Sequence, residues 1–128
     1  VEEIGYEINA YENIYDELGK WEWDIIRSVR VCLDVGLNYY DWSDEKAIRF
    51  WRRHIKNKDY IAKREIARMK RWPAQVITYK YGANRILEWR LRSKVKTPEN
   101  IKEFHRKILK NGSIPFSVLN KVMFEEIN

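Results

Sequence analysis

The stretch Trp72–Arg90, with the sequence WPAQVITYKYGANRILEWR, decides the fold. A proline disfavours helical geometry in the residue before it and fits the first turn of a helix, so Trp72-Pro73 predicts a break between two helices. Beyond the break, apolar residues recur at helical spacing: Val76, Ile77, Ala83, Ile86 and Leu87. We therefore expect a helix from Pro73 to about Ser93.

Four residues inside this pattern are unusual for a helix that only packs: Gln75, Tyr79, Lys80 and Gly82. A structural helix favours alanine and leucine at such positions. One helical turn separates Gln75 from Tyr79, so the two side chains fall on the same face. The segment is a candidate functional site, and the alternative is a set of hydrogen bonds that ties two helices together.

The rest of the sequence also carries the helical period. Four helices are expected before the break, over residues 4–18, 21–37, 44–54 and 59–69. Ser43 is a good N-cap for the third, and Asn57 or Asp59 starts the fourth. The expected apolar side of the second helix consists of Ile25, Val29, Cys32 and Leu33.

Two helices are expected after the break. Thr97-Pro98-Glu99 is a strong helix start and Asn111-Gly112 an end, while Pro115 opens a last helix that runs to about Ile127. The core face of the first of these helices is expected to hold Ile101, Phe104, Ile108 and Leu109. No alternating strand pattern is present, so we predict an all-α fold of about seven helices in a single domain over residues 1–128.

The composition of the chain limits the cellular compartments in which we expect to find it. No apolar run approaches the roughly 20 residues that span a bilayer, and Val1-Glu2-Glu3-Ile4 lacks the features of a signal peptide. The single cysteine, Cys32, cannot form an internal disulfide and is expected in the core, which favours a reducing compartment such as the cytoplasm. Abundant Ile, Asn, Lys and Tyr indicate an A/T-rich genome, such as that of a parasite, symbiont or virus.

The net charge of +6 hides a steep division along the chain. Residues 1–45 hold 12 acidic and 3 basic residues, whereas residues 46–110 hold 21 basic and 5 acidic residues. Such asymmetry is typical of a nucleic-acid-binding face. It also fits a fold in which one half lies against the other, or against a missing acidic segment.

Four blocks of this sequence resemble the C-terminal third of a family of zinc metallopeptidase-like proteins, known as domain of unknown function 885. Residues 73–82 are similar to its P-G-Q-A-x-x-Y-K-x-G segment. Leu18-Gly19, Arg27–Arg30, Asp34–Leu37, Trp42 and Ala47-Ile48 follow its L-G, R-A-x-R, D-x-G-L-H, G-W and A-I pattern. Phe104-His105 with Leu109, and Asn111–Pro115, match F-H-x-x-L-L and N-G-x-L-P. The resemblance implies the helical array of the C-terminal part of that fold.

The departures from the family pattern concern its chemistry. Asn38 replaces the histidine of D-x-G-L-H, and Ala74 replaces the glycine of P-G-Q. The resemblance implies zinc ligands on an H-E-x-x-G-H-type helix and a later glutamate, all of which would fall before Val1. No H-E-x-x-H is present in residues 1–128, so we expect no metal site and no cofactor in this chain, with zinc belonging to the parent family.

The resemblance also implies roles for individual residues. Tyr79 would stabilise a developing oxyanion in a complete enzyme, with Gln75 and Lys80 orienting substrate or a neighbouring carboxylate. Arg30 and Asp34 stand four apart on one helix and would support the cleft, and Asn38 cannot replace a histidine as a base. The structural alternative for each is packing or hydrogen bonding. His105 is expected to pack or hydrogen-bond rather than to bind a metal, and His54 is expected at the surface.

A basic run with interleaved aromatic residues extends from Arg49 to Arg71. It could track phosphates and stack bases, or form a solvated face, or bind an acidic protein. No DNA-reading motif accompanies it. Its principal members are Arg49, Arg52, Arg53, Lys56, Lys63, Arg64, Arg68 and Arg71.

Three functions follow as hypotheses. The first is a C-terminal helical portion of a zinc metallopeptidase-like protein, a fragment or truncated homologue, inactive alone and partnered by the missing N-terminal metal-binding portion. The second is a repurposed basic binding module for nucleic acid or an acidic protein. The third is a structural component of an assembly, with another chain as its partner.

Overall fold

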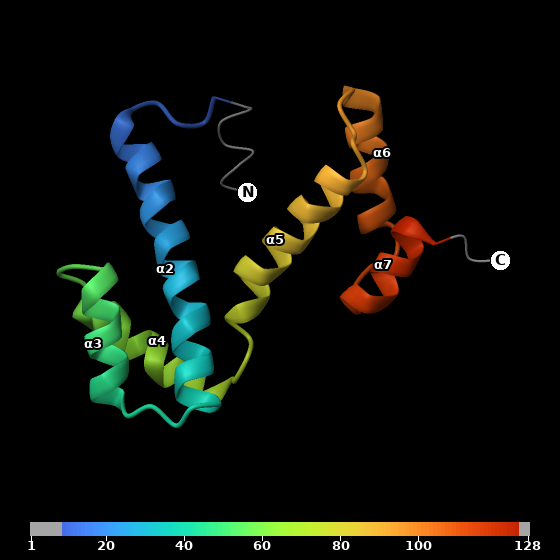
Figure 1. The fold of residues 1–128 in the computed structure, drawn as a ribbon. Coiled ribbons are helices and arrows are strands. Elements are labelled where there is room, and N and C mark those ends of the chain that lie inside the picture. The colour runs from blue at the N-terminus through green and yellow to red at the C-terminus, as the bar shows by residue number, and fades with distance from the viewer. Residues whose placement is uncertain (1–8, 126–128) are drawn as a thin grey trace. The chain divides into compact units, whose positions relative to one another are not determined.

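The computed structural model describes residues 9–125, which form six helices and no strand. They are α2 (Ile14–Asn38), α3 (Asp44–His54), α4 (Asp59–Arg71), α5 (Ile77–Arg92), α6 (Pro98–Leu109) and α7 (Phe116–Phe124) (Figure 1). The predicted all-α fold is confirmed. Ile4 and Ile8, which open the first expected helix, lie outside the described residues. Among residues 9–125 no helix is both long enough and apolar enough to cross a membrane.

The chain divides into two compact units, residues 1–83 and 84–128, and each has its own cluster of buried side chains. We call them unit 1 and unit 2 and describe each by itself. The candidate site residues predicted from the Trp72–Arg90 stretch belong to unit 1. The expectation of a single domain over residues 1–128 stays a prediction.

Helix α2 corrects the expected break between two helices at residues 19–20. The described part of the chain before Asn13 is not helical, and the Asn13 side chain accepts hydrogen bonds from the backbone N–H groups of Tyr15 and Asp16. This cap fixes the true start of the helix. Gly19 then continues the helix, because glycine inside a helix costs only about 1 kcal/mol and does not remove a hydrogen bond.

Unit 1 is built on mutual packing of α2, α3 and α4, which lie side by side at the lower end of α2 in Figure 1. One face of α2 is buried through Ile26, Val29, Leu33 and Leu37. The rest of the core comes from the later segments, with Ala47, Trp51, Ile55, Ile61, Ala62, Ile66, Met69 and Val76.

Two residues expected on the apolar side of α2 are exposed instead, Ile25 and Cys32. Each directly precedes a buried position, Ile26 or Leu33, and one residue turns a helix by about 100°. The buried face therefore runs beside these two residues rather than through them. The prediction that Cys32 is a core residue is wrong.

The corner between α4 and α5 confirms the predicted break and corrects the start of the next helix. Trp72 ends α4, its N–H donating to the carbonyl of Arg68. The expected helix from Pro73 begins only at Ile77, because Ala74 has a φ of 67°, which is left-handed and interrupts helical geometry. The residues between form turns, from which Val76 is buried in the unit 1 core.

Unit 2 packs α6 against α7, with Trp89 of α5, Phe104, Ile108 and Leu119 buried together. The Thr97 side chain caps α6 by accepting from the N–H of Asn100, and Pro98 occupies its first turn, as predicted. Leu109, expected in the core, is exposed because the buried face of α6 passes through Ile108, one residue away.

Candidate functional site

The α4–α5 corner of unit 1 brings together five polar side chains, which we call the Tyr79 cluster: Arg30, Glu65, Arg68, Gln75 and Tyr79. Gln75 is its link, since its Oε1 accepts from Arg68 Nη2 at 2.8 Å and its Nε2 donates to Tyr79 Oη at 3.2 Å. Arg68 projects from α4, Tyr79 from α5 and Gln75 from the turns between them. The predicted pairing of Gln75 with Tyr79 is therefore present.

A buried ion pair lies beneath this chain of hydrogen bonds. Arg30 Nε on α2 approaches Glu65 Oε2 on α4 at 3.1 Å, and the two side chains are only 9% and 8% exposed. Arg68 Nη1 lies 3.7 Å from the same carboxylate oxygen. The Arg30 guanidinium also lies over the Tyr79 ring, with its Cζ 5.6 Å from the ring centroid. Burial lowers the pKa of Arg30, and Glu65 partly opposes this effect.

The cluster carries an excess of positive charge, with two guanidinium groups against one carboxylate. Arg30 Nη2 and Arg68 Nε are buried and have no hydrogen-bond partner among the described residues. The field at the Tyr79 hydroxyl is therefore set by cations. The hydrogen bond from Gln75 first, and then Arg68, lower the pKa of Tyr79 below its ordinary value of 10.0.

Tyr79 is the most exposed member of the cluster, at 47% exposure. Its oxygen accepts from Gln75, so its own hydroxyl proton remains for an acceptor outside the cluster. A phenol whose pKa is lowered is also a stronger hydrogen-bond donor. This arrangement suits the stabilisation of a negatively charged oxygen on a bound molecule.

Asp34 and Asn38 lie next to the cluster and hold the corner in place. Both carboxylate oxygens of buried Asp34 accept from the backbone N–H of Ala74, at 2.9 and 3.1 Å. Asn38 Nδ2 donates to Asp34 Oδ1 and to the carbonyl of Met69, each at 3.2 Å. Asp34 thus supports the turn that carries Gln75 rather than pairing with Arg30.

Two other candidates lie apart from the Tyr79 cluster. Lys80 Nζ binds Asp24 Oδ1 of α2 at 2.6 Å, so its charge is used inside unit 1. His105 is an exposed residue of α6 in unit 2, where its ring contacts the Phe104 ring edge-on at 5.5 Å. His54 is exposed on α3, as expected.

Glu65 is the member that the sequence reasoning missed. It stands four residues after Ile61 and four before Met69, on the buried face of α4. A carboxylate in the middle of an apolar stripe is the signal that could have found it, since buried acids are rare unless paired.

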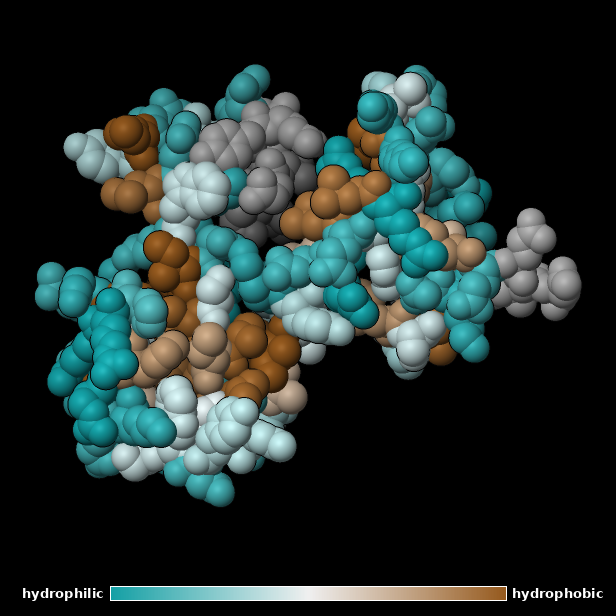
Figure 2. Space-filling view, viewed as in Figure 1, coloured by the Kyte–Doolittle hydropathy of each residue, from teal (hydrophilic) through white to brown (hydrophobic). Residues whose placement is uncertain are grey.

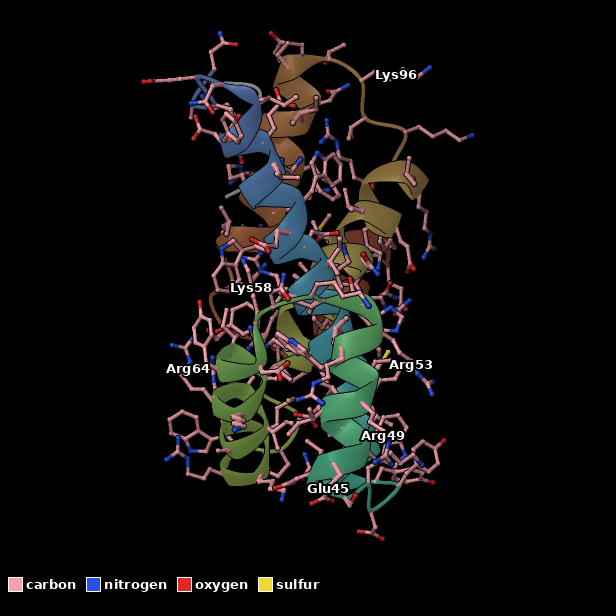
Figure 3. The ribbon with its side chains drawn as sticks, turned by 90° about the vertical axis from the view of Figure 1, so that its left-hand side faces the viewer. Glu45, Arg49, Arg53, Lys58, Arg64 and Lys96 are labelled. Carbon is pink, nitrogen blue, oxygen red and sulfur yellow. The ribbon has the colours of Figure 1, made fainter. Side chains whose placement is uncertain are left out.

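The basic run does not form one surface. Arg49 and Arg53 project from one side of α3, while Arg64 projects from α4 on the other side (Figure 3). Arg52 is held by Asp59 through a hydrogen bond of 2.6 Å, and Arg68 belongs to the Tyr79 cluster. The remaining members, Lys56, Lys63 and Arg71, are exposed.

The residues that the structure describes do not fit a zinc ion. No group of three or more His, Cys, Asp or Glu side chains among them could hold a metal. Three carboxylates of unit 1 are engaged with other groups: Glu65 with Arg30, Asp34 with the backbone N–H of Ala74, and Asp24 with Lys80.

Comparison with known protein families shows a match over almost the whole chain. Residues 1–123 fit the sequence profile of a family described as "Bacterial protein of unknown function (DUF885)". No curated protein and no solved structure matches the chain.

Proposed function

The chain belongs to the DUF885 family of bacterial proteins of unknown function, and from this premise we propose that it is the metal-free helical portion of a zinc metallopeptidase-like protein. In this role it forms one wall of a substrate cleft. A separate portion with the H-E-x-x-H motif supplies the metal-binding residues. The observation that carries the proposal is the exposed Tyr79 hydroxyl, activated by Gln75 and Arg68.

The Tyr79 hydroxyl donates a hydrogen bond to the oxygen of a peptide carbonyl as negative charge develops on it. Gln75 fixes the orientation of this hydroxyl, and Arg68 in turn fixes Gln75. The buried Arg30–Glu65 pair holds α2 and α4 at the spacing that the chain of hydrogen bonds needs. Preorganised donors of this kind contribute because they do not have to reorganise as the reaction proceeds.

On its own, the chain is catalytically inactive in this proposal, because peptide hydrolysis in such proteins requires about three protein ligands on one zinc ion. We expect the isolated chain to retain no stoichiometric zinc and to hydrolyse no peptide. Elemental analysis after dialysis and a peptide-cleavage assay with added zinc measure both. Stoichiometric zinc together with hydrolysis by this chain would overturn the proposal.

The role of Tyr79 is tested in the complete protein, in which the H-E-x-x-H portion accompanies this chain. Tyr79→Phe removes one oxyanion donor and is expected to lower kcat by about 10²- to 10³-fold with little change in KM. Tyr60→Phe is the matched control, an exposed tyrosine of α4 outside the cluster, and should leave kcat unchanged. Equal activity of the two variants would remove Tyr79 from the mechanism.

A further inference from the structure

A second site lies in unit 2, at the end of α5 and the turn that follows it. A hollow of about 660 Å³ is lined there by Leu87, Arg90, Leu91, Lys94, Val95 and Lys96. We call it the α5 groove. None of its residues belongs to the Tyr79 cluster.

The floor of the α5 groove is apolar and open to solvent. Leu87 and Leu91 stand one helical turn apart on α5, and Leu91 is 78% exposed. Figure 2 shows hydrophobic surface over these last turns of α5. Lys94 has a φ of 51°, a left-handed conformation that turns the chain so that Val95 also lines the groove. Exposed apolar residues gathered in a hollow are typical of a binding surface.

The edges of the groove are cationic, through Arg90, Lys94 and Lys96. Within the part of the chain that the structure describes, no ion pair or hydrogen bond engages these three side chains. Their neighbours are engaged, since Arg92 lies over the Phe124 ring at 4.1 Å. Figure 3 shows Lys96 projecting outward from the turn.

The dipole of α5 explains only part of this pattern. Basic residues in the last turn of a helix stabilise its negative end, which accounts for Arg90. It does not account for Lys96, which lies beyond the helix, or for the two exposed leucines. The apolar floor of the groove and the cations at its edges together indicate a ligand that is apolar on one face and acidic along the sides of that face.

We propose that the α5 groove binds an acidic amphipathic helical segment of a partner protein. Leucine-sized side chains of the segment cover Leu87 and Leu91, and its glutamates or aspartates pair with Arg90, Lys94 and Lys96. A membrane surface fits less well, because the groove is concave and has none of the Trp or Tyr side chains typical of membrane interfaces. Nucleic acid fits less well because no aromatic ring lines the groove to stack on a base.

The test uses the full chain and a synthetic peptide in which leucines recur every three to four residues and glutamates fill the positions between them. Binding is measured by fluorescence anisotropy at two salt concentrations. The variant Arg90→Glu, Lys94→Glu, Lys96→Glu is expected to bind about tenfold more weakly or worse. Leu91→Ser, which changes no charge, is expected to weaken binding as well.

The matched control is Lys102→Glu, Lys110→Glu, Lys121→Glu, with the same charge change at exposed positions of unit 2 outside the groove. It should bind within about twofold of the original chain. Circular dichroism checks that every variant keeps its helices. An equal loss in the control, or binding to phosphatidylserine vesicles or single-stranded DNA but not to the peptide, would overturn the proposal.

Discussion

Ala74 holds a backbone conformation that suits glycine better than alanine. Its φ of 67° costs a residue with a Cβ about 1 kcal/mol or more, and the two hydrogen bonds from its N–H to Asp34 keep it there. The segment reads Pro73-Ala74-Gln75 in this chain, and the P-G-Q pattern that it resembles would place at residue 74 a glycine, which adopts this φ without strain.

Ala74→Gly is therefore expected to stabilise the chain by about 0.5–1 kcal/mol, because the relief of strain exceeds the added freedom of the unfolded chain. Urea unfolding followed by circular dichroism measures the change. Ala67→Gly, at an exposed helical position of α4, is the control and should destabilise by about 1 kcal/mol. Loss of stability in both variants would show that Ala74 is not strained.

Tyr79 gives the cluster a dependence on pH. Its pKa is lowered in the folded chain by Gln75 and Arg68, so above the lowered pKa the folded state holds the phenolate while the unfolded state is still protonated. The ionised Tyr79 therefore adds to the free energy of unfolding in full above pH 10. This contribution is lost as the pH falls through the lowered pKa, and it is absent at neutral pH.

We therefore expect Tyr79 to ionise below the ordinary tyrosine pKa of 10.0, as an early step when the phenolate absorbance is followed from pH 7 upward. In Tyr79→Phe the early step should disappear, whereas Tyr60→Phe should keep it. An unchanged titration in Tyr79→Phe would mean that the hydrogen bonds to its hydroxyl do not persist in solution.

At the level of the helix, the two glycines of α2 differ in the space that is available for a side chain. A Cβ on Gly36 would lie 2.5 Å from the Trp42 ring, which packs over the end of α2. The backbone N–H of Trp42 donates to the Gly36 carbonyl at 2.9 Å and holds the loop there. A Cβ on Gly19 would meet nothing within 4 Å. Gly36 is therefore required by the close approach of the loop, and Gly19 is not required by any contact.

Opposite effects are expected from the two alanine substitutions. Gly36→Ala should destabilise by about 1–3 kcal/mol, since Trp42 has to move, and Gly19→Ala should stabilise by about 0.5–1 kcal/mol, since alanine is the better helix former. Thermal unfolding compares the two directly. A stabilising Gly36→Ala would mean that the Trp42 ring does not pack on this helix.

The sequence predicted those elements whose ends are set by local chemistry. Ser43, Thr97 with Pro98, and Trp72 fix helix ends through their own side chains or rings, and the structure places them as expected. The start of α5 depends on the left-handed φ of Ala74, which a tertiary contact with Asp34 holds in place. The continuity of α2 depends on Gly19, where no neighbouring side chain interrupts the helix.

The candidate site was predictable in part for the same reason. Helical spacing alone pairs Gln75 with Tyr79, because both lie on one segment. The partners from other helices, Arg30, Glu65 and Arg68, meet them only through the packing of α2 on α4. Spacing along one helix carries no information on such contacts, so the sequence places Arg30 one turn from Asp34 and does not predict its contact with Glu65.

At the scale of the whole molecule, the acidic and basic segments of the chain partly neutralise each other inside unit 1. Lys58 pairs with Glu22, Lys70 with Asp44, and Lys80 with Asp24. Each pair joins a base from the basic segment to an acid from residues 1–45. Pairs of this kind contribute only about 0.5 kcal/mol each to stability. They nevertheless neutralise basic side chains that could otherwise bind the phosphates of a nucleic acid.

This distribution of charge predicts weak binding to nucleic acid. Six convergent phosphate contacts would give a slope of about −5 for the logarithm of affinity against the logarithm of salt concentration on duplex DNA. Arg52, Lys58 and Lys70 are already paired, and Arg49 and Arg64 project in different directions, so fewer cations can meet one duplex. We expect a slope no steeper than about −2, measured by anisotropy of a labelled duplex between 50 and 200 mM salt. A slope near −5 would instead establish the basic run as a nucleic-acid interface, provided that the double variant Arg49→Glu, Arg53→Glu makes the slope shallower. Only charges that act together on one duplex release that many counterions.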